Sequence, residues 1–361
     1  MSKIILEGLA HMKKVLIIQS VLPEYRVPIF NLLNKQYDVT VMVPKSPKLT
    51  TKPEFAILVA PERHIPHLGR FFVGYKNIIR QFDVCISMLA ANYPQVVFSL
   101  LGKKKTKMIL WGIGVSAGYG IPYDSQPKYR KVLRSLIHRA NAALFYSDYP
   151  LSVYQSLGIS KEKLFVANNT VAVEPKEKKN SDYLLFVGSL YPAKGVDVLL
   201  KQYNEAYQIN HEIEDLLIVG DGSEREKCEK LCKDSGLGRK VTFLGSIFEE
   251  ERLSELFSGA IACISPNQAG LSVLKSMGYG VPFVTSATSI TGGERFNIQD
   301  KINGVIYENE EDLKMIILDI HHDRNKYIEM GKKAKAYYEK CRKPEVMVKG
   351  FVDAIEYVLR T

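Results

Sequence analysis

The chain has no apolar run long enough to cross a bilayer, for which about 18 consecutive apolar residues are needed. Its first apolar runs, Ile4–Leu6 and Val15–Ile18, are short, and no small-residue cleavage site follows them, so they do not predict a secretory signal. We therefore predict a cytoplasmic protein. Because Met12-Lys13-Lys14 stands before the first strand pattern, residues 1–11 are interpreted as a dispensable extension.

Cysteine is scarce and scattered, with five in the chain, an odd number. Cys228 and Cys232 stand four residues apart, but no nearby His or further Cys completes a zinc-binding set. This pattern predicts structural cysteines in a reducing compartment and no metal site.

Glycine is missing from the segment after the first strand pattern, Gln19–Arg26, where a dinucleotide fingerprint needs it so that the backbone can approach pyrophosphate. The segment Trp111–Gly114 has two glycines in that spacing but lacks the third. A Walker loop and a Gly-x-Ser-x-Gly nucleophile elbow are also absent. These absences argue against an NAD-dependent enzyme, a P-loop nucleotidase and an α/β hydrolase.

The formal net charge of +10 is unevenly distributed. Residues 1–180 hold 26 Lys and Arg against 11 Asp and Glu, whereas residues 181–361 hold 23 against 28. The basic first half predicts a partner with phosphates, whether an anionic membrane, a lipid diphosphate or a nucleic acid. Nucleic acid is the least favoured, because the basic runs carry no interleaved aromatics beyond Tyr129 and no DNA- or RNA-binding module is present.

At 361 residues the chain is longer than one core usually grows, which predicts two domains. Short β-branched runs alternate with helical patterns in both halves, as is typical of parallel sheets covered on both faces. The polar stretch 174–181 predicts a linker between a first domain, residues 1–173, and a second, residues 182–343, with a further helix over 344–361. The fold class is therefore α/β, with two Rossmann-like doubly wound domains whose ligands bind beyond the carboxyl ends of the strands. The predicted strands are Val15–Gln19, Val39–Val43, Val84–Ser87, Met108–Trp111, Ala143–Tyr146, Leu164–Ala167, Tyr183–Val187, Leu216–Val219, Val241–Leu244, Ala260–Ile264, Phe283–Thr285 and Gly304–Ile306.

The strand pattern that opens the second domain is followed by Gly188–Gly195 and then by the helical pattern Val196–Tyr203. Glycine lets a phosphate approach the backbone, the helix N-terminus adds a positive dipole, and Lys194 adds a full charge. The pattern predicts a phosphate site, although a solvated loop with a surface lysine would look the same.

Two further glycine turns follow strand patterns, Val219–Gly222 and Phe243–Gly245, and each is equally compatible with a tight turn of no function. In the later stretch Ser265–Pro282, a helix that begins near Gly270 would direct its first backbone N–H groups to the carboxyl edge of the sheet. A diphosphate would bind there, and Lys275 lies about one turn further along the helix.

Five segments resemble, in order and spacing, the motifs of GT-B glycosyltransferases, most closely those of the large retaining family four. They are Gly188–Gly195, Gly220–Gly222, Phe243–Gly245, Ser265–Leu271 and Gly280–Pro282. The resemblance covers the second half through its motifs and the first half through its architecture alone. It implies retaining transfer of a hexosyl group from a UDP- or GDP-linked sugar to a saccharide or a lipid-diphosphate-linked acceptor, in cell-surface polysaccharide synthesis. It also implies two domains facing each other across a cleft, a donor site in the second, an acceptor site in the first, a C-terminal helix that crosses back to the first, and no metal or other cofactor.

The sequence departs from this family at its Glu-x7-Glu motif. The register set by Gly270 and by Gly280–Pro282 puts Asn267 and Lys275 where the two glutamates stand. Asn267 is expected to hydrogen-bond a hydroxyl of the donor sugar. Lys275 cannot accept from ribose but can pair with a phosphate as a point charge, and its alternatives are a salt bridge and a solvated helix face.

Two other positions differ, since Ser189 replaces an arginine of the phosphate loop and Ile113 replaces a histidine of the first domain. The loop Ser265–Leu271 resembles that of capsule- and exopolysaccharide-type members with a substituted motif, which carry an acidic residue downstream, as Glu294 is here. Glu294 is expected either to contact the acceptor or to be a surface charge of its loop.

The resemblance assigns the site residues by position. The expected catalytic residues are Lys194, Asn267 and Glu294. The expected donor-binding residues are Gly188, Ser189, Lys194, Gly195, Gly222, Gly245, Gln268, Ala269, Gly270, Leu271, Ser272 and Lys275. The expected acceptor-side residues are Tyr25, Arg26, Trp111 and Gly112, of which Arg26 either holds an acceptor phosphate or carboxylate or is a surface arginine.

Two basic stretches, Lys103–Lys107 and Lys128–Arg139, carry much of the charge of the first half. The second has apolar residues at helical spacing, so one face of the predicted helix is apolar and the other cationic. Such a helix either packs on its own sheet or docks on a membrane surface, which predicts peripheral contact with an anionic membrane at the inner face of the cell membrane.

Two other functions remain open. A sugar-nucleotide epimerase shares the GT-B fold, but it needs titratable groups in its cleft, and this sequence places few there. A catalytically inactive partner that binds a nucleotide or stabilises another transferase is favoured by the missing glutamates and histidine.

The sequence has no Asp-x-Asp motif for a metal-bound diphosphate, and cationic groups stand in its place. We expect sugar transfer to survive EDTA, measured as release of the nucleotide diphosphate. Complete loss with EDTA, restored by Mn²⁺ or Mg²⁺, would contradict this account of phosphate binding.

Overall fold

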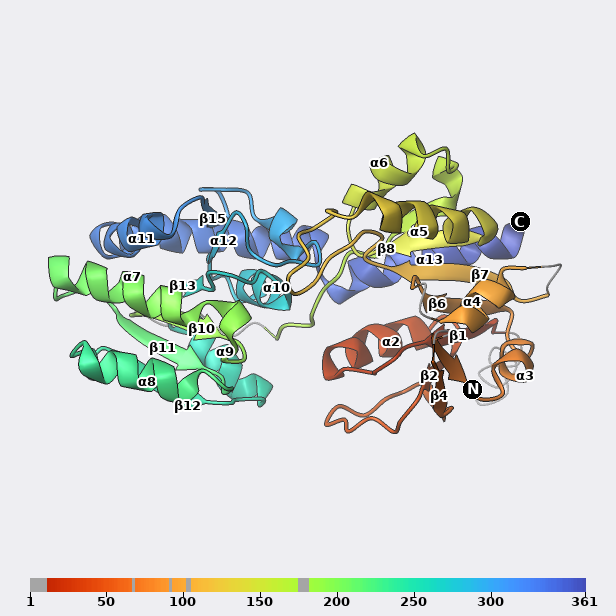
Figure 1. Cartoon of the computed structure of the whole chain (residues 1–361), viewed down its shortest axis with the longest axis horizontal. Helices are drawn as coiled ribbons and strands as arrows, with labels where there is room; N and C mark the ends of the chain where they lie inside the picture. The colour runs from red at the N-terminus through yellow and green to blue at the C-terminus, as the bar shows by residue number, and fades with distance from the viewer. Residues whose placement is uncertain (1–11, 67–68, 91–92, 102–104, 175–181) are drawn as a thin grey trace, which may run out of the picture. The chain divides into compact units, whose positions relative to one another are not determined.

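The computed structural model describes residues 12–66, 69–90, 93–101, 105–174 and 182–361. These residues form two compact units, each built around its own parallel sheet (Figure 1). The first unit is made of the described residues within Met1–Ser116, Asp124–Ala172 and Lys343–Thr361, and the second of those within Ala117–Tyr123 and Val173–Arg342. Of the predicted linker, only Glu174 is among the described residues.

The first sheet has seven parallel strands in the order β3-β2-β1-β6-β7-β8-β9. The direction of winding reverses between β1 and β6, which makes that gap the switch point of a doubly wound sheet, where ligands usually bind. An antiparallel hairpin of β4 (Glu62–Ile65) and β5 (Gly69–Phe72) lies outside this sheet. The strands of the sheet are β1 (Lys14–Ile18), β2 (Asp38–Val43), β3 (Ala56–Val59), β6 (Val84–Met88), β7 (Lys107–Gly112), β8 (Ala142–Phe145) and β9 (Leu164–Val166).

Helices cover both faces of the first sheet because successive side chains of each strand point to opposite faces. Val15 and Ile17 of β1 pack with α2 and α13, whereas Leu16 and Ile18 pack with α3, α4, α5 and α6. The helices of this unit are α2 (Val27–Asn34), α3 (Tyr75–Ile79), α4 (Pro94–Ser99), α5 (Pro127–Arg139), α6 (Tyr149–Ser156) and α13 (Pro344–Arg360), with 3-10 turns η1 (Glu24–Arg26) and η2 (Lys161–Lys163).

The C-terminal helix α13 belongs to the first unit, although about 170 residues separate it from the rest of that unit in the sequence. Its Phe351 contacts Trp111 edge to face, with ring centroids 4.7 Å apart, and also meets Phe30 at 6.3 Å. Edge-to-face aromatic pairs of this kind add to the burial of apolar surface. The helix therefore completes the core on one face of the first sheet.

The second sheet has six parallel strands in the order β12-β11-β10-β13-β14-β15. Its winding reverses between β10 and β13, so this sheet also has a switch point. The strands are β10 (Tyr183–Val187), β11 (Asp215–Val219), β12 (Val241–Gly245), β13 (Ala260–Ile264), β14 (Phe283–Ser286) and β15 (Gly304–Tyr307).

One face of the second sheet packs against α7, α8, α11 and the start of α12, and the other against α9, α10 and the end of α12. In Figure 1, α7 and α8 lie along the strands of this unit. The helices are α7 (Val196–Ile209), α8 (Arg225–Asp234), α9 (Glu250–Ser258), α10 (Leu271–Gly278), α11 (Glu310–His322) and α12 (Arg324–Cys341), with 3-10 turns η3 (Pro192–Lys194) and η4 (Glu294–Asn297).

Each predicted strand coincides with an observed strand to within a residue at either end. The prediction missed β3 and the hairpin β4–β5, whose residues are mostly exposed or half-buried and so lack the buried apolar runs by which the other strands were found. All five cysteines are free, and four of them are buried. Within the described ranges, no helix combines the length and the apolar composition needed to span a bilayer.

The position of α13 generates a stability prediction. A methyl group at Gly350 would overlap the carbonyl oxygen of Val166, so the helix packs against the sheet at backbone contact. Gly350→Ala is expected to lower the free energy of unfolding by about 1–3 kcal/mol, as overpacking does, even though alanine favours a helix by about 1 kcal/mol over glycine.

The measurement is urea denaturation of the full chain. Gly238→Ala is the matched control, because its added methyl group meets no atom within 4 Å, and its change should stay below about 0.5 kcal/mol. Wild-type stability in Gly350→Ala would contradict the close packing of α13.

Candidate functional site

The two strands at the switch point of the second sheet each lead into a helix whose first turn no side chain caps. Strand β10 leads to α7, whose N-cap is Gly195, and β13 leads to α10, whose N-cap is Gly270. Uncapped N-terminal turns present backbone N–H groups and the positive end of the helix dipole. This pair of helix N-termini therefore suits an anion such as a diphosphate.

Lys194 lies at the end of η3, between β10 and α7, and its side chain folds back over the end of the strand. A methyl group at Gly188 would lie 3.6 Å from the Lys194 Nζ. Burial lowers the pKa of the Lys194 ammonium, and among the described residues no carboxylate pairs with it. A half-buried cation without a counter-charge gains stability when an anion binds beside it.

Asn267, from the loop after β13, packs directly on Gly195. Gly195 has a φ of +68°, and a methyl group there would lie 2.5 Å from Asn267 Nδ2. The Asn267 backbone N–H also donates to the carbonyl oxygen of Lys194 at 3.4 Å. The fold thus brings together Lys194 and Asn267, which were predicted as site residues from separate motifs.

The loop that carries Gln268 and Ala269 is held by the loop after β14. Ile290 donates its backbone N–H to the carbonyl oxygen of Asn267 at 2.8 Å, and Ala269 donates to that of Ile290 at 2.9 Å. The Tyr119 hydroxyl donates to Gln268 Oε1 at 3.5 Å. Tyr119 was missed, and the segment 117–123 was predicted within the first domain, because no sequence spacing signals a contact across 149 residues.

The glycine turn after β11 packs against the loop after β10. A methyl group at Gly220 would overlap the carbonyl oxygen of Gly188, and one at Gly222 would lie 2.5 Å from that of Leu190. Leu190 in turn donates its backbone N–H to the carbonyl oxygen of Asp221. Close packing against Leu190 is therefore enough to explain a glycine at position 222. Its role in donor binding stays a prediction.

The other predicted donor residues lie around the same edge. Ser189 is exposed and Ala269 is buried, while Leu271 and Ser272 are half-buried in the first turn of α10. Gly245 ends β12, and its carbonyl oxygen accepts from the Gly220 backbone N–H at 2.8 Å.

Lys275 forms the salt bridge that was one of its three alternatives. Its Nζ lies 2.6 Å from Glu250 Oε2, and the Tyr279 hydroxyl donates to the other carboxylate oxygen. A phosphate would reach Lys275 only in competition with Glu250, and the alternative of a solvated helix face is wrong. Glu250, on the neighbouring helix α9, was missed because 25 residues separate it from Lys275.

Glu294 is buried at the start of η4, so the alternative of a surface loop charge is wrong. Its carboxylate accepts the backbone N–H of Gly292 at 2.9 Å and lies 3.5 Å from the Thr291 hydroxyl. Glu294 therefore orders its own loop, and its contact with an acceptor stays a prediction.

The predicted acceptor-side residues lie at the carboxyl ends of β1 and β7 in the first unit. Arg26 is only 2% exposed, so the alternative of a surface arginine is wrong. Its guanidinium lies 4.6 Å from the ring centroid of Trp111, 5.1 Å from Tyr25 and 5.2 Å from Tyr146, and its Nη1 lies 3.4 Å from the sulfur of Met347. These cation–π contacts stabilise the buried charge, with which no carboxylate of the described residues pairs.

Trp111 is buried in the core, and Gly112 approaches the Cβ of Leu89. An anionic acceptor would reach Arg26 only if the aromatic rings around it moved. Tyr25, which is half-buried, is the more accessible of the pair.

The second unit of this chain is similar in sequence to known glycosyltransferases. Residues 169–337 match the family model of the glycosyl transferases group 1. An uncharacterized glycosyltransferase of Methanocaldococcus jannaschii is 29% identical over 160 residues, which are 43% of this chain and 38% of that protein. The lipopolysaccharide 1,6-galactosyltransferase of Salmonella typhimurium is 26% identical over 262 residues, which are 68% of this chain and 66% of that protein. The matches therefore span less than two thirds of both relatives.

The crystal structure of HepE from Anabaena, in complex with UDP, aligns with 96% of this chain and all of its own, with a TM-score of 0.71 and 14% identity. The predicted fold class, α/β with two Rossmann-like units of the GT-B type, is confirmed. The resemblance to the group 1 family is confirmed over residues 169–337. The capsule-type subgroup, the Glu-x7-Glu register and the cleft between the units stay predictions.

The contact of Gly195 with Asn267 generates a prediction with a matched control. Gly195→Ala and Gly236→Ala both force alanine into a left-handed conformation, at φ +68° and +72°, but only the first meets another side chain. Gly236→Ala is expected to lose about 1–2 kcal/mol of stability for its left-handed backbone. Gly195→Ala is expected to lose more, because its methyl group also displaces Asn267. Only Gly195→Ala should weaken binding of a nucleotide sugar, by about tenfold for one lost hydrogen bond, as measured by calorimetry. Equal binding by both variants would place the donor away from Asn267.

Proposed function

We propose that this protein is a retaining glycosyltransferase that binds the diphosphate of a nucleotide sugar at the N-termini of α7 and α10. The observation that carries the proposal is the meeting, at the switch point of the second sheet, of two uncapped helix N-termini and the half-buried Lys194. Backbone N–H groups, helix dipoles and a cation together suit a diphosphate leaving group.

The donor is proposed to be a UDP- or GDP-linked hexose. The HepE structure contains UDP, and the Salmonella relative is named a lipopolysaccharide galactosyltransferase. Both support a nucleotide sugar as donor and a saccharide or lipid-linked saccharide as acceptor for this chain, in cell-surface polysaccharide synthesis. Asn267, which packs on the Gly195 turn beside Lys194, would hydrogen-bond a hydroxyl of the transferred sugar.

The chemistry proposed for this site is electrostatic. As the bond to the sugar breaks, negative charge grows on the leaving diphosphate, and preorganised positive groups stabilise the transition state more than the ground state. Lys194 and the two helix N-termini supply those groups, so no metal is required. The departing phosphate itself would take the acceptor proton, and we assign no side chain as general base.

The acceptor is proposed to bind the first unit, near the carboxyl end of β1, where Tyr25 is half-buried. Arg26 is buried among aromatic rings and stabilises the core of this unit, which explains the residue without an acceptor. An acceptor phosphate is therefore better sought near other cations of this unit.

One observation favours a second function, a nucleotide-binding partner without catalysis. The salt bridge with Glu250 neutralises Lys275, so one cation expected at the leaving group is already paired. The two functions separate in one experiment, because a catalytically inactive partner would bind UDP or GDP but release none from a nucleotide sugar in the presence of acceptor.

Lys194→Met is the sharpest test of the donor site. It keeps the length of the side chain and removes its charge, so kcat/KM should fall about 10²-fold, the usual loss for one group that stabilises a developing anion. Lys194→Arg should retain part of the activity. A thermal-shift screen with nucleotide sugars identifies the donor first, since a ligand at 100 times its Kd stabilises by about 2.7 kcal/mol.

Lys201→Met on the exposed side of α7 is the matched control and should behave as the wild type. Stability should change by less than about 0.5 kcal/mol in both variants. Equal turnover and equal donor affinity in Lys194→Met and wild type would remove the main support for the proposed function.

A further inference from the structure

A cavity of about 1030 Å³ lies in the first unit, away from the site described above. It is lined by β5, α3, α4 and the residues that precede β6 and β7, such as Arg80 and Thr106. Those residues mark the amino ends of the strands, whereas the switch point of this sheet lies at the carboxyl ends. The cavity, which we call the α3–α4 cavity, is therefore separate from the proposed acceptor site in the same unit.

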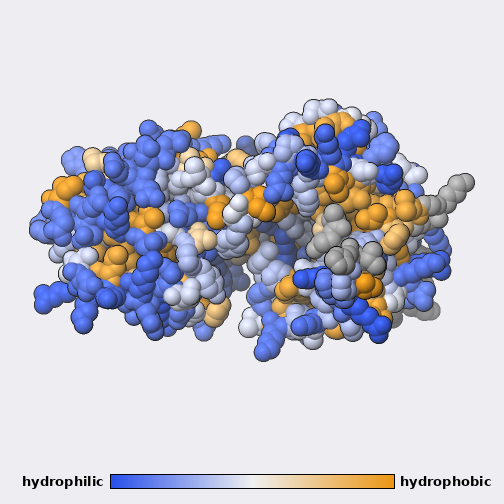
Figure 2. Space-filling view, in the orientation of Figure 1, coloured by the Kyte–Doolittle hydropathy of each residue, from blue (hydrophilic) through white to orange (hydrophobic). Residues whose placement is uncertain are grey.

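One part of the α3–α4 cavity is apolar and opens to solvent. Phe71, Phe72, Phe98 and Leu101 line it, and the last two are 64% and 51% exposed. Val73, beside the same wall, is also exposed. Figure 2 shows apolar residues gathered around α4 on this face. Large apolar side chains that remain in water next to an open cavity indicate a surface that binds something apolar.

The other part of the cavity is cationic. Of its 14 lining residues, Lys76, Arg80 and Lys105 are basic and none is acidic. Among the described residues, these three cations form no salt bridge. A concave surface that carries only positive charge attracts an anion.

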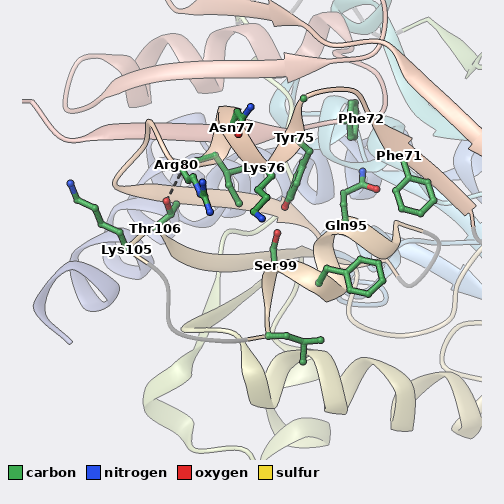
Figure 3. Close-up of a pocket in the computed structure, with 14 residues that line it drawn as sticks. Phe71, Phe72, Tyr75, Lys76, Asn77, Arg80, Gln95, Ser99, Lys105 and Thr106 are labelled. Carbon is green, nitrogen blue, oxygen red and sulfur yellow. Dashed lines mark hydrogen bonds between the residues drawn. The ribbon is translucent and has the colours of Figure 1, made fainter.

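Tyr75 points into the cationic part with an unsatisfied hydroxyl. The residue is only 7% exposed, and its hydroxyl forms no hydrogen bond of normal geometry with the described residues. Figure 3 shows the Tyr75 hydroxyl, the Lys76 ammonium and the Ser99 hydroxyl pointing toward one another. Burial raises the pKa of Tyr75, while the nearby Ser99 hydroxyl opposes the rise. Tyr75 therefore keeps its proton, and its hydroxyl can donate a hydrogen bond to an oxyanion.

We propose that the α3–α4 cavity binds one anionic phospholipid of a membrane surface, with the phosphate at Tyr75, Lys76 and Arg80 and a hydrocarbon chain against Phe98 and Leu101. A buried hydroxyl donor beside unpaired cations fits a phosphate oxygen, and the exposed apolar wall fits a chain that inserts from a bilayer. A free phosphate would account for the hydroxyl donor and the cations but not for the exposed apolar wall. This proposal concerns docking and does not depend on the proposed sugar transfer.

The test is co-sedimentation of the full chain with vesicles of phosphatidylglycerol or of phosphatidylcholine at physiological salt. Wild type should bind the first and not the second. Tyr75→Phe keeps the ring and removes only an unsatisfied buried hydroxyl, so the fold should be unaffected or more stable. Its binding to phosphatidylglycerol should fall about tenfold. Lys76→Gln should lose about fivefold, as one cation at an anionic surface does.

The matched controls lie on α5, the other basic amphipathic surface of this unit. Lys131→Gln and Val132→Asp change an exposed cation and an exposed apolar residue there, whereas Lys76→Gln and Phe98→Asp change their counterparts at the cavity. The proposal requires that the cavity variants lose binding and the α5 variants keep it.

The reverse result would assign membrane contact to α5 and overturn the proposal. Wild-type binding by Tyr75→Phe would also overturn it. A third outcome would also overturn the proposal. If Phe98→Asp binds vesicles as wild type does, and millimolar inorganic phosphate abolishes that binding, the cavity recognises a phosphate group and no hydrocarbon chain.

Discussion

Backbone contact between neighbouring loops is the constraint on which the second unit depends. The turn after β11 lies so close to the loop after β10 that a side chain at Gly220 would overlap the Gly188 carbonyl. On the other side, Gly195 leaves room for Asn267 from the loop after β13. These contacts hold three loops at one edge of the sheet, and Lys194 lies between two of them. The glycines therefore set the position of the cation. Lys194 is half-buried there, and no carboxylate among the described residues pairs with it.

The first unit has a different arrangement of side chains at the switch point of its sheet. Its switch point also follows the first strand, but there the residue after the turn is Arg26, enclosed by Trp111, Tyr25 and Tyr146. Met347 and Phe351 extend this cluster to α13, so the C-terminal helix and the first βα turn share one core. A buried guanidinium stacked on aromatic rings is costly to expose and stable where it lies. The two units thus share a sheet topology but differ at the switch point. The second has two helix N-termini that no side chain caps, and the first has a closed aromatic cluster.

The sequence predicted features that are local in the chain and missed those that depend on distant partners. Apart from β3, the strands of both sheets follow from runs of buried apolar residues, and the uncapped start of α10 follows from the glycine before it. The salt bridge of Lys275 could not be predicted, because Glu250 lies on another helix and its spacing has no period to detect. The burial of Glu294 and Arg26 was not predicted for another reason, because a charged residue in a polar loop is normally exposed. The contact of Tyr119 with Gln268 likewise exists only once the chain is folded.

The surplus of basic residues in the first half of the sequence has more than one structural meaning. Arg26 is buried in the core, and Arg130 pairs with Asp124, so neither is available for direct contact with a partner at the surface. Lys76, Arg80 and Lys105 remain available at the surface, because none of the described residues that line their cavity carries a carboxylate. A net charge counted along the chain cannot distinguish these cases, since it weights a buried guanidinium and an exposed ammonium equally. The partner is determined by the place where unpaired cations lie beside an unsatisfied hydrogen-bond donor and exposed apolar side chains. In the described part of this unit, that place is the α3–α4 cavity, where Tyr75 and Phe98 lie beside the cations.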